Sequence, residues 1–380
     1  MVSNLFDFER ILNSKPNSGV ILSARVRIEA KLFDGRDLYY FDDQNSSLLA
    51  ERKSDLREKD VRPQTAELRF DALTGDYITV ASHRQSRAFL PPANVCPLCP
   101  TTETNLSELP DNFDVAVFEN KGPAFGPALG EMTAVGDQPF GYSTTAFGRC
   151  EVVVFSPEHT GSLGSMPVSR IETVIRAWSD RTRDLYSQPG VVQVFPFENR
   201  GQEIGVTLHH PHGQIYAYPF VTPKTKQLLA EIEKYGPNFF QDLYEFESKG
   251  ERVILESEHF IAYVPFAARW PIEIHAMPKR AVQDFSQLNE FEISDLASFY
   301  KTLLQGVDKI YDSPTPYIAA WHQAPKIEKR NQFRLMLQIT SPRRASDKLK
   351  YLAGSEAAMG AWVGDVTPES TAQRLREVMQ

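Results

Sequence analysis

Residues 199–214 read Asn199-Arg-Gly-Gln-Glu-Ile-Gly-Val-Thr-Leu-His-His-Pro-His-Gly-Gln214. Mostly apolar residues precede this stretch at 191–195 and follow it at 215–220, so the pattern predicts a strand, a glycine-bearing loop and a second strand. Gly201 and Gly205 allow the loop to turn sharply and to approach a ligand closely.

Three histidines fall within four positions of this stretch, at His209, His210 and His212, in a chain with eight histidines. Because residues two apart in a strand share a face, His210, His212 and Gln214 are predicted to point the same way. One imidazole that attacks a phosphorus atom and one amide that holds a phosphoryl oxygen would suit phosphate chemistry. The alternative is a polar edge strand in which the histidines have no joint role, but chance clustering explains the spacing less well.

Two motifs in this stretch match a known family: Glu198-Asn199-x-Gly201 and His210-Pro-His212-Gly-Gln214. Together they resemble the active-site signature of galactose-1-phosphate uridylyltransferases, the transferase branch of the histidine-triad superfamily. The resemblance covers roughly residues 67–380. It implies an α+β protein with a duplicated histidine-triad-like fold, in which a mostly antiparallel sheet is flanked by helices. In the hydrolase branch a third histidine stands at the position of Gln214, so the glutamine favours transfer over hydrolysis.

The composition is that of a globular protein, with 42% apolar and 24% charged residues among 380. The net charge of −8 argues against a nucleic-acid partner, which a basic surface would normally bind. The first 20 residues contain no apolar core of signal-peptide length, and no apolar run is long enough to span a membrane. Three cysteines make no disulfide framework, so we expect a cytoplasmic protein.

The pattern of elements predicts three segments. Residues 1–66 form an N-terminal extension of unknown role, with possible hairpin strands at 20–28 and 37–41. The resemblance implies that residues 67–220 form a first histidine-triad-like half, which would hold a zinc site and the nucleophile. Residues 221–380 form a second such half, which ends in a sugar-phosphate segment.

The two halves are predicted to be copies of one unit. A strand at Val152–Phe155, a helix, and His212-Gly-Gln214 are echoed by a strand at Glu273–Met277, a helix at Glu290–Ile310, and Met336-Leu-Gln338. Gln214 and Gln338 are 124 residues apart. Because Met336 stands where His212 stands in the first copy, the second half cannot hold a reaction centre of the same kind.

Cys96-Pro-Leu-Cys99 has the spacing of a zinc knuckle, which needs two more ligands to complete a tetrahedron. The alternative is a redox dithiol, but the flanking prolines oppose the helix that follows such a motif in thioredoxin-like folds. His159 and His210, at strand ends, match the zinc-ligand positions of the family. The resemblance thus implies one structural Zn²⁺ held by Cys96, Cys99, His159 and His210.

Other positions match substrate-binding residues of the family. The resemblance assigns phosphate contacts to Arg84 and Arg87 and a uridine contact to Asn120, although the family's following Asp is Lys121 here. The remaining assigned residues are Leu98, Asn199, Gly205, Thr207, Lys350 and Glu356. The last two belong to a segment that in the family reaches a sugar phosphate across a dimer interface.

The sequence departs from the family at a second metal site. Several members bind an additional iron or zinc ion through a glutamate and three histidines. Here His322 is present, but Met336 and Gln338 occupy two ligand positions and Leu228 falls near the glutamate's. We therefore expect no iron.

The resemblance implies uridylyl transfer from UDP-glucose to galactose 1-phosphate by double displacement, with His212 as nucleophile and Gln214 as a catalytic hydrogen-bond donor. A homodimer is expected. One alternative is an enzyme of the same fold that acts on ADP-sugars or dinucleoside polyphosphates. Another is a zinc-knuckle binding protein without activity, which would leave His212 and Gln214 unexplained.

Overall fold

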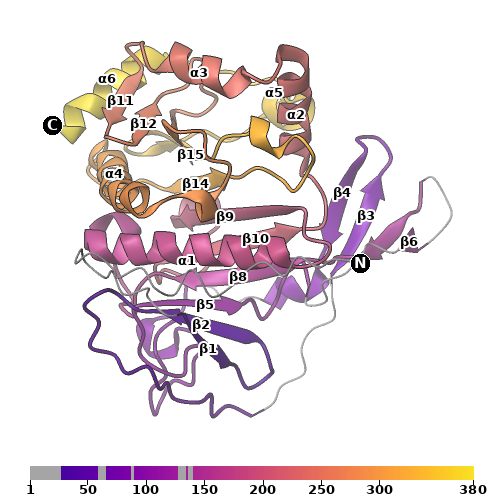
Figure 1. The fold of residues 1–380 in the computed structure, drawn as a ribbon, viewed down its shortest axis with the longest axis vertical. Coiled ribbons are helices and arrows are strands. Elements are labelled where there is room, and N and C mark those ends of the chain that lie inside the picture. Colours follow the sequence, from indigo (N-terminus) through magenta and orange to yellow (C-terminus); the bar gives the residue numbers. More distant parts are fainter. Residues whose placement is uncertain (1–26, 59–65, 87–89, 127–133, 136–139) are drawn as a thin grey trace, which may run out of the picture.

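The computed structural model describes residues 27–58, 66–86, 90–126, 134–135 and 140–380. Its central feature is an antiparallel sheet of eleven strands in the order β1-β2-β5-β8-β10-β9-β14-β15-β13-β12-β11 (Figure 1). Six strands come from the first part of the chain: β1 (Ile28–Lys31), β2 (Asp37–Phe41), β5 (Val115–Glu119), β8 (Arg149–Val154), β9 (Gln193–Arg200) and β10 (His212–Tyr218). Five follow later: β11 (Val253–Glu256), β12 (Phe260–Tyr263), β13 (Ile272–Pro278), β14 (Tyr317–His322) and β15 (Met336–Ser341).

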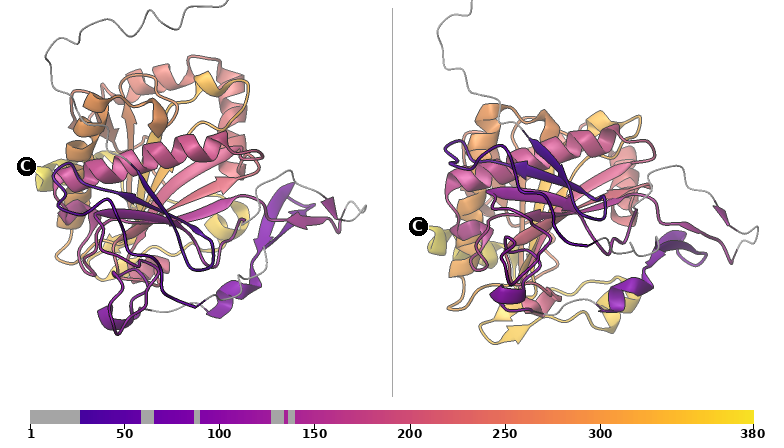
Figure 2. Two further views of the ribbon diagram at one scale, coloured as in Figure 1. Left: turned by 60° about the horizontal axis from the view of Figure 1, so that its bottom comes forward. Right: turned by 90° about the horizontal axis from the view of Figure 1, so that it is seen from below.

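The remaining elements are a small sheet, a short hairpin and helices. The small sheet combines β3 (Glu67–Asp71), β4 (Asp76–Val80), β6 (Ala134–Val135) and β7 (Ser143–Thr145), and projects from the main body (Figure 2). The hairpin consists of β16 (Arg343–Ala345) and β17 (Lys348–Leu349). The α-helices are α1 (Val168–Ser187), α2 (Pro223–Tyr235), α3 (Phe239–Glu247), α4 (Glu290–Lys309), α5 (Gly354–Met359) and α6 (Pro368–Met379).

The strand order confirms the duplicated α+β fold. In the first half β10 lies between β8 and β9, and in the second half β15 lies between β13 and β14. The two copies meet where β9 pairs antiparallel with β14, with Arg200 opposite Tyr317 and Phe197 opposite Ala320. Met336 opens β15 as His212 opens β10, so the offset in the sequence corresponds to an equivalent place in the sheet.

The main helices α1 and α4 cover one face of the sheet (Figures 1 and 2). Trp321 of β14 packs against Trp178 of α1, with ring centroids 6.2 Å apart, and against Tyr300 of α4 at 5.6 Å. These rings belong to one continuous apolar core that extends across both halves. The next residue in β14, His322, therefore points to the opposite face.

The hairpin that was assigned to the N-terminal extension is part of the main sheet. β1 pairs with β2, and Leu38 to Phe41 of β2 pair with 115–118 of β5. The pairing of β2 with β5 was not predicted, because a sheet edge recruits strands by backbone hydrogen bonds that a local pattern does not reveal. Most of the strand expected at 20–28 lies outside the described residues.

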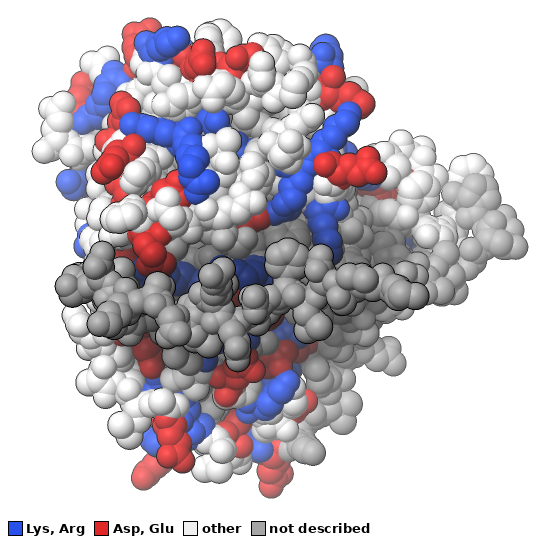
Figure 3. All heavy atoms as spheres, viewed as in Figure 1, with Lys and Arg blue, Asp and Glu red and all other residues white. Residues whose placement is uncertain are grey.

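The surface and the helices add two observations. Lys and Arg side chains are interspersed with Asp and Glu on the face shown in Figure 3. Among the helices in the described ranges, none combines the length and apolar character needed to cross a lipid bilayer.

Candidate active site

His212 is held by its own strand. Its Nδ1 lies 2.7 Å from the backbone oxygen of His210, so Nδ1–H donates to that carbonyl and Nε2 keeps its lone pair. Burial lowers the pKa of His212, which keeps the ring neutral at physiological pH. The hydrogen bond to the His210 carbonyl thus fixes the tautomer of the neutral ring.

Gln214 shares a face of β10 with His212. Both residues are partly exposed, whereas Gly213 and Ile215 between and after them are buried. A Cβ at Gly213 would lie 2.8 Å from Cζ of Phe155, so only glycine lets the strand pack this closely.

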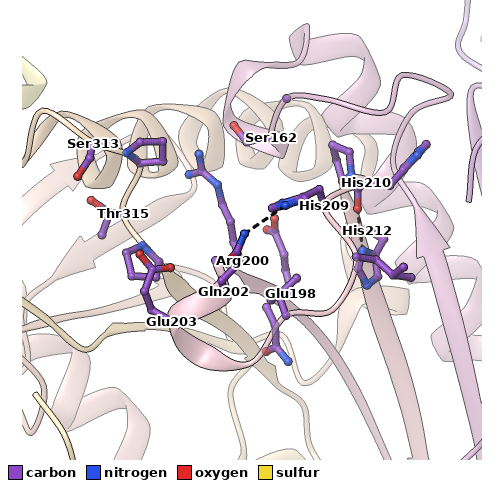
Figure 4. Close-up of a pocket in the computed structure, with 18 of the residues that line it drawn as sticks. Ser162, Glu198, Arg200, Gln202, Glu203, His209, His210, His212, Ser313 and Thr315 are labelled. Atoms are coloured by element: carbon purple, nitrogen blue, oxygen red, sulfur yellow. Dashed lines mark hydrogen bonds between the residues drawn. The ribbon is translucent and has the colours of Figure 1, made fainter. Parts of the chain in front are cut away.

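A cavity of about 640 Å³ lies beside His212 (Figure 4). Its first wall comes from the β9–β10 region and residues 161–162, and its second wall from 313–316 and Arg343 of the other half. The cavity therefore lies between the two copies of the fold. Its labelled lining residues in Figure 4 are Ser162, Glu198, Arg200, Gln202, Glu203, His209, His210, His212, Ser313 and Thr315.

The loop after β9 is fixed against the second half. Gly201 has φ 104°, and a Cβ there would lie 2.6 Å from Cβ of Pro316. Glu203 accepts a hydrogen bond of 2.8 Å from Arg343, which also donates to Ser313 Oγ at 2.7 Å. This wall of the cavity is thus preorganised, and it is built from residues that are far apart in the sequence.

Glu198 is a cavity residue to which the sequence analysis gave no role. It is 4% exposed and accepts a 3.1 Å hydrogen bond from the Tyr317 hydroxyl. Burial raises the pKa of Glu198 to about 7. Its place directly before Asn199 in the recognised motif was the available signal. No signal in the sequence identified Arg343 or residues 313–316 as cavity residues, because their proximity to the cavity depends on the pairing of β9 with β14.

The four predicted metal ligands lie together. Their ligand atoms are all within 4.8 Å of one another. His210 Nδ1 lies 3.8 Å from Cys96 Sγ and 3.5 Å from Cys99 Sγ, and His159 Nδ1 lies 3.5 Å from Cys99 Sγ. The bond lengths of tetrahedral zinc give edges of roughly 3.5 Å between such atoms.

The chemistry of this cluster also suits a divalent cation. His210 is 1% exposed and its Nε2 lies 2.8 Å from the Ser156 backbone oxygen, which orients Nδ1 toward the sulfur atoms. Burial, together with Cys96, raises the pKa of the Cys99 thiol to about 12. A bound cation would supply the charge that holds both sulfur atoms as thiolates.

The predicted phosphate and uridine residues are spread around this region. Asn199 lines the cavity, and Gly205 (φ 84°) and Thr207 lie on the same loop. Arg84 lies in a 3-10 turn at Ser82–Ser86, and Arg87 lies outside the described residues. Asn120 accepts a 2.9 Å hydrogen bond from the Gly122 N–H.

Like Arg84, Asn120, Gly205, Thr207 and Gln214, the predicted residues Leu98, Lys350 and Glu356 do not line this cavity. Leu98 is 2% exposed and packs in an apolar cluster with Cys96, so its side chain contributes to the core. Lys350 and Glu356 lie 3.6 Å apart and pair with each other. Lys350 lines a separate cavity of about 170 Å³, which shares Glu203 with the larger one.

Known proteins resemble this chain over most of its length. Models of the galactose-1-phosphate uridyl transferase family match residues 54–222 (N-terminal domain) and 224–380 (C-terminal domain). A galactose-1-phosphate uridylyltransferase of Streptomyces lividans is 39% identical over 373 residues, 93% of this chain and 98% of that protein.

Solved structures show the same likeness. The structure of a uridylyltransferase has a TM-score of 0.74 at 32% identity, over 83% of this chain and 98% of that one. An ADP-glucose phosphorylase from Arabidopsis thaliana, solved with ADP-glucose, has a TM-score of 0.62 at 26% identity, over 83% and 99%. The fold, the clustered motif residues and these matches together place the chain in the galactose-1-phosphate uridylyltransferase family.

Proposed function

We propose that the enzyme transfers a uridylyl group from UDP-glucose to galactose 1-phosphate through a covalent adduct on His212. The observation that carries this proposal is the His212 ring beside the cavity, with Nδ1–H bound to the His210 carbonyl at 2.7 Å. That hydrogen bond leaves Nε2 as the nucleophilic atom. The curated relatives named above support the uridylyl donor and the galactose 1-phosphate acceptor.

The reaction takes two displacements at one phosphorus atom. Nε2 of His212 forms a bond to the α-phosphorus of UDP-glucose, and the bond to the bridging oxygen breaks, so that its electron pair leaves with glucose 1-phosphate. A phosphate oxygen of galactose 1-phosphate then attacks the same phosphorus, and the P–N bond breaks to give UDP-galactose. Both leaving groups are stable without added protons, so positioning and charge stabilisation are the main tasks of the protein.

We assign positioning and charge stabilisation to Gln214 and to residues of the loop between β9 and β10. The Gln214 amide can donate a hydrogen bond to a non-bridging oxygen but cannot relay a proton at neutral pH. We assign contacts with the phosphates or the ribose to Asn199, which lines the cavity, to Gly205 and Thr207 of the same loop, and to Arg84. Because Gln214 stands where the hydrolase branch has a histidine, β10 offers no acid–base group at this position that could activate water to hydrolyse the adduct.

Zn²⁺ bound by Cys96, Cys99, His159 and His210 would be structural. With four protein ligands the metal has no open position for substrate. Its ligand His210 is the residue whose carbonyl orients His212, so the metal site would fix the strand that carries the nucleophile.

Lys350 and Glu356 would act in a homodimer. Within one chain Lys350 borders a different cavity from His212, and Glu356 pairs with Lys350. We propose that this segment contributes to the sugar-phosphate site of the partner subunit. Light scattering that reports a monomer at working concentrations would contradict this assignment.

A second candidate function is adenylyl transfer or phosphorolysis on ADP-sugars, which the likeness to the ADP-glucose phosphorylase favours. Mass spectrometry of intact protein after incubation with UDP-glucose, or separately with ADP-glucose, decides between them. The expected result is one uridylyl group on His212, none in His212→Ala, and a normal adduct in the control His259→Ala, which replaces a histidine that lines neither the cavity beside His212 nor its zinc cluster. An adenylyl adduct in place of the uridylyl adduct would support the second candidate.

A further inference from the structure

A second cavity, of about 240 Å³, lies in the second half of the molecule. It is bordered by α2, by Phe240 of α3 and by the adjoining ends of β14 and β15, which carry His322 and Met336. Met336 holds the place in β15 that His212 holds in β10, so this cavity is the counterpart of the active cavity in the duplicated fold. The two cavities have no lining residue in common.

Three cationic side chains border this cavity, namely Lys224, Arg269 and Arg334. Among the salt bridges of the described residues, none includes any of the three. The ammonium of Lys224 donates to Oε1 of Gln338 at 2.6 Å, and burial lowers the pKa of Lys224. Positive charge is thus gathered at this cavity without a salt bridge, although Glu231 lines the same cavity and the charge of Glu273 acts on Lys224.

Arg334 differs from the other buried arginines. It is 4% exposed, donates to Gln241 Oε1 at 3.0 Å and contacts Met277 Sδ at 3.9 Å, while its Nε has no partner. Each of the other buried arginines of the described chain forms a salt bridge with a carboxylate: Arg36, Arg149, Arg181, Arg252 and Arg343. A buried cation without a carboxylate is costly, and burial lowers the pKa of Arg334 accordingly.

The nearby carboxylates are engaged elsewhere. Glu273 accepts hydrogen bonds from Gln338 Nε2 at 2.7 Å and from the Arg269 backbone N–H at 2.6 Å, and His275 lies 3.1 Å away. Glu231, which lines the cavity, lies 3.6 Å from Lys234 on its own helix. Neither carboxylate neutralises Arg334.

The remaining lining restricts the ligand. His322 lies 3.2 Å from Gln338 Oε1, and burial lowers its pKa to about 3, so it stays neutral. Phe240 and Phe333 add apolar walls. The volume, less than half that of the cavity beside His212, suits a small anion.

We propose that this second cavity binds a phosphate group, free or as a monoester of a small metabolite, through Lys224, Arg269 and Arg334. Guanidinium and ammonium groups are the usual protein ligands of phosphate. A ligand with one carboxylate carries a single negative charge, which three cations around one small cavity exceed. A phosphate dianion carries two negative charges and therefore suits the three cations better. The inference does not depend on the uridylyl reaction, because the site shares no residue with the cavity beside His212.

The test is the change in melting temperature with inorganic phosphate or glycerol 3-phosphate, measured against sodium chloride at equal ionic strength. UDP is present throughout to occupy the larger cavity. The wild type should show a saturable rise in melting temperature. Lys224→Met and Arg334→Met should each bind phosphate at least about tenfold more weakly. Lys309→Met, an exposed lysine at the end of α4, should respond as the wild type.

For each variant, the melting temperature with phosphate is compared with that of the same variant without phosphate. A difference in basal stability therefore does not affect the result. A tighter response to glycerol 3-phosphate than to phosphate would identify a monoester as the ligand, and the reverse would identify free phosphate. The proposal is overturned if the wild type responds no more than in sodium chloride. It is also overturned if both Lys224→Met and Arg334→Met retain the full response.

Discussion

At the scale of single residues, the chemistry of the site depends on one hydrogen bond. The His210 carbonyl fixes the tautomer of His212, and the same residue, His210, turns its own ring toward the two cysteines. Nucleophile and metal ligand are therefore coupled through two residues of one strand. This coupling explains why the order His-Pro-His is informative in a short sequence.

His212→Ala should retain its fold and its metal, because the ring is not a ligand and its neighbours are held by β8. Transferase activity should fall on the order of 10⁴-fold or more, as expected when a covalent nucleophile is removed. The measurement is UDP-galactose formation in a coupled assay, with zinc content determined in parallel. His259→Ala, which removes a histidine outside both the cavity and the metal cluster, is the matched control. An active His212→Ala enzyme would remove the nucleophile assignment.

Gln214→Ala should slow formation of the uridylyl adduct by about 10²–10³-fold, the usual loss for one oxyanion donor. The same variant should keep the metal and the His212 environment. Rapid-quench measurement of adduct formation from UDP-glucose separates this step from acceptor binding. Normal adduct formation would show that Gln214 is a strand residue without a catalytic role, and would weaken the argument for transfer over hydrolysis.

Several residues show where local pattern is sufficient and where it is not. The alternation predicted that His210, His212 and Gln214 share a face. His212 and Gln214 do so in β10, because a strand has a fixed period of two, whereas His210 precedes the strand and turns its ring toward the cysteines. The resemblance assigns Leu98 to the substrate site, and the structure shows its side chain buried in the core. A position in a motif gives the neighbourhood of a residue but not the direction of its side chain.

At the scale of elements, buried charges connect helix and sheet. Arg181 of α1 is fully buried and donates to Glu151 of β8 at 2.8 Å. Arg149 in β8 lies 3.2 Å from the same carboxylate. The helix that covers the first half is thus fixed to the strand next to the nucleophile.

Arg181→Met should destabilise the protein by about 3–5 kcal/mol, because it leaves the Glu151 carboxylate buried with fewer partners. The double variant Arg181→Met/Glu151→Gln should recover part of that loss. Urea unfolding of the two variants and of the wild type measures the difference. Equal stability of Arg181→Met and wild type would contradict the importance of this pair.

The zinc knuckle is the second element that can be tested. The protein should contain about one zinc per chain and no iron, and Cys96→Ser should lose zinc and melting temperature together, because closed zinc sites contribute folding free energy. Elemental analysis of protein purified without added metal gives the content. Cys150→Ala, outside the cluster, should keep its zinc. Stoichiometric iron, or full zinc in Cys96→Ser, would contradict this prediction.

At the scale of the whole molecule, the sequence predicted the duplication but not the extent of the sheet. The two copies were visible because equivalent motifs recur at a constant offset, from Gln214 to Gln338. No recurring motif in the sequence indicates that β2 pairs with β5. Phe41 and Val115 are 74 positions apart, and the local pattern of each strand does not identify its partner. The same reason hid the contribution of Arg343 to the active cavity.

The hairpin β1–β2 should therefore be part of the cooperative fold. Leu38 is fully buried opposite Phe118, and Leu38→Ala should cost about 2–5 kcal/mol, as large-to-small changes in a core do. All four tryptophans of the chain lie outside the hairpin, at 178, 270, 321 and 362, so their fluorescence reports on the rest of the molecule. Urea unfolding followed by tryptophan fluorescence should show a lower midpoint for Leu38→Ala and an unchanged one for the exposed control Glu29→Ala. If the hairpin were an independent extension, the tryptophan midpoint of Leu38→Ala would equal that of the wild type, because unfolding of the hairpin would leave the sheet around Trp178 and Trp321 intact.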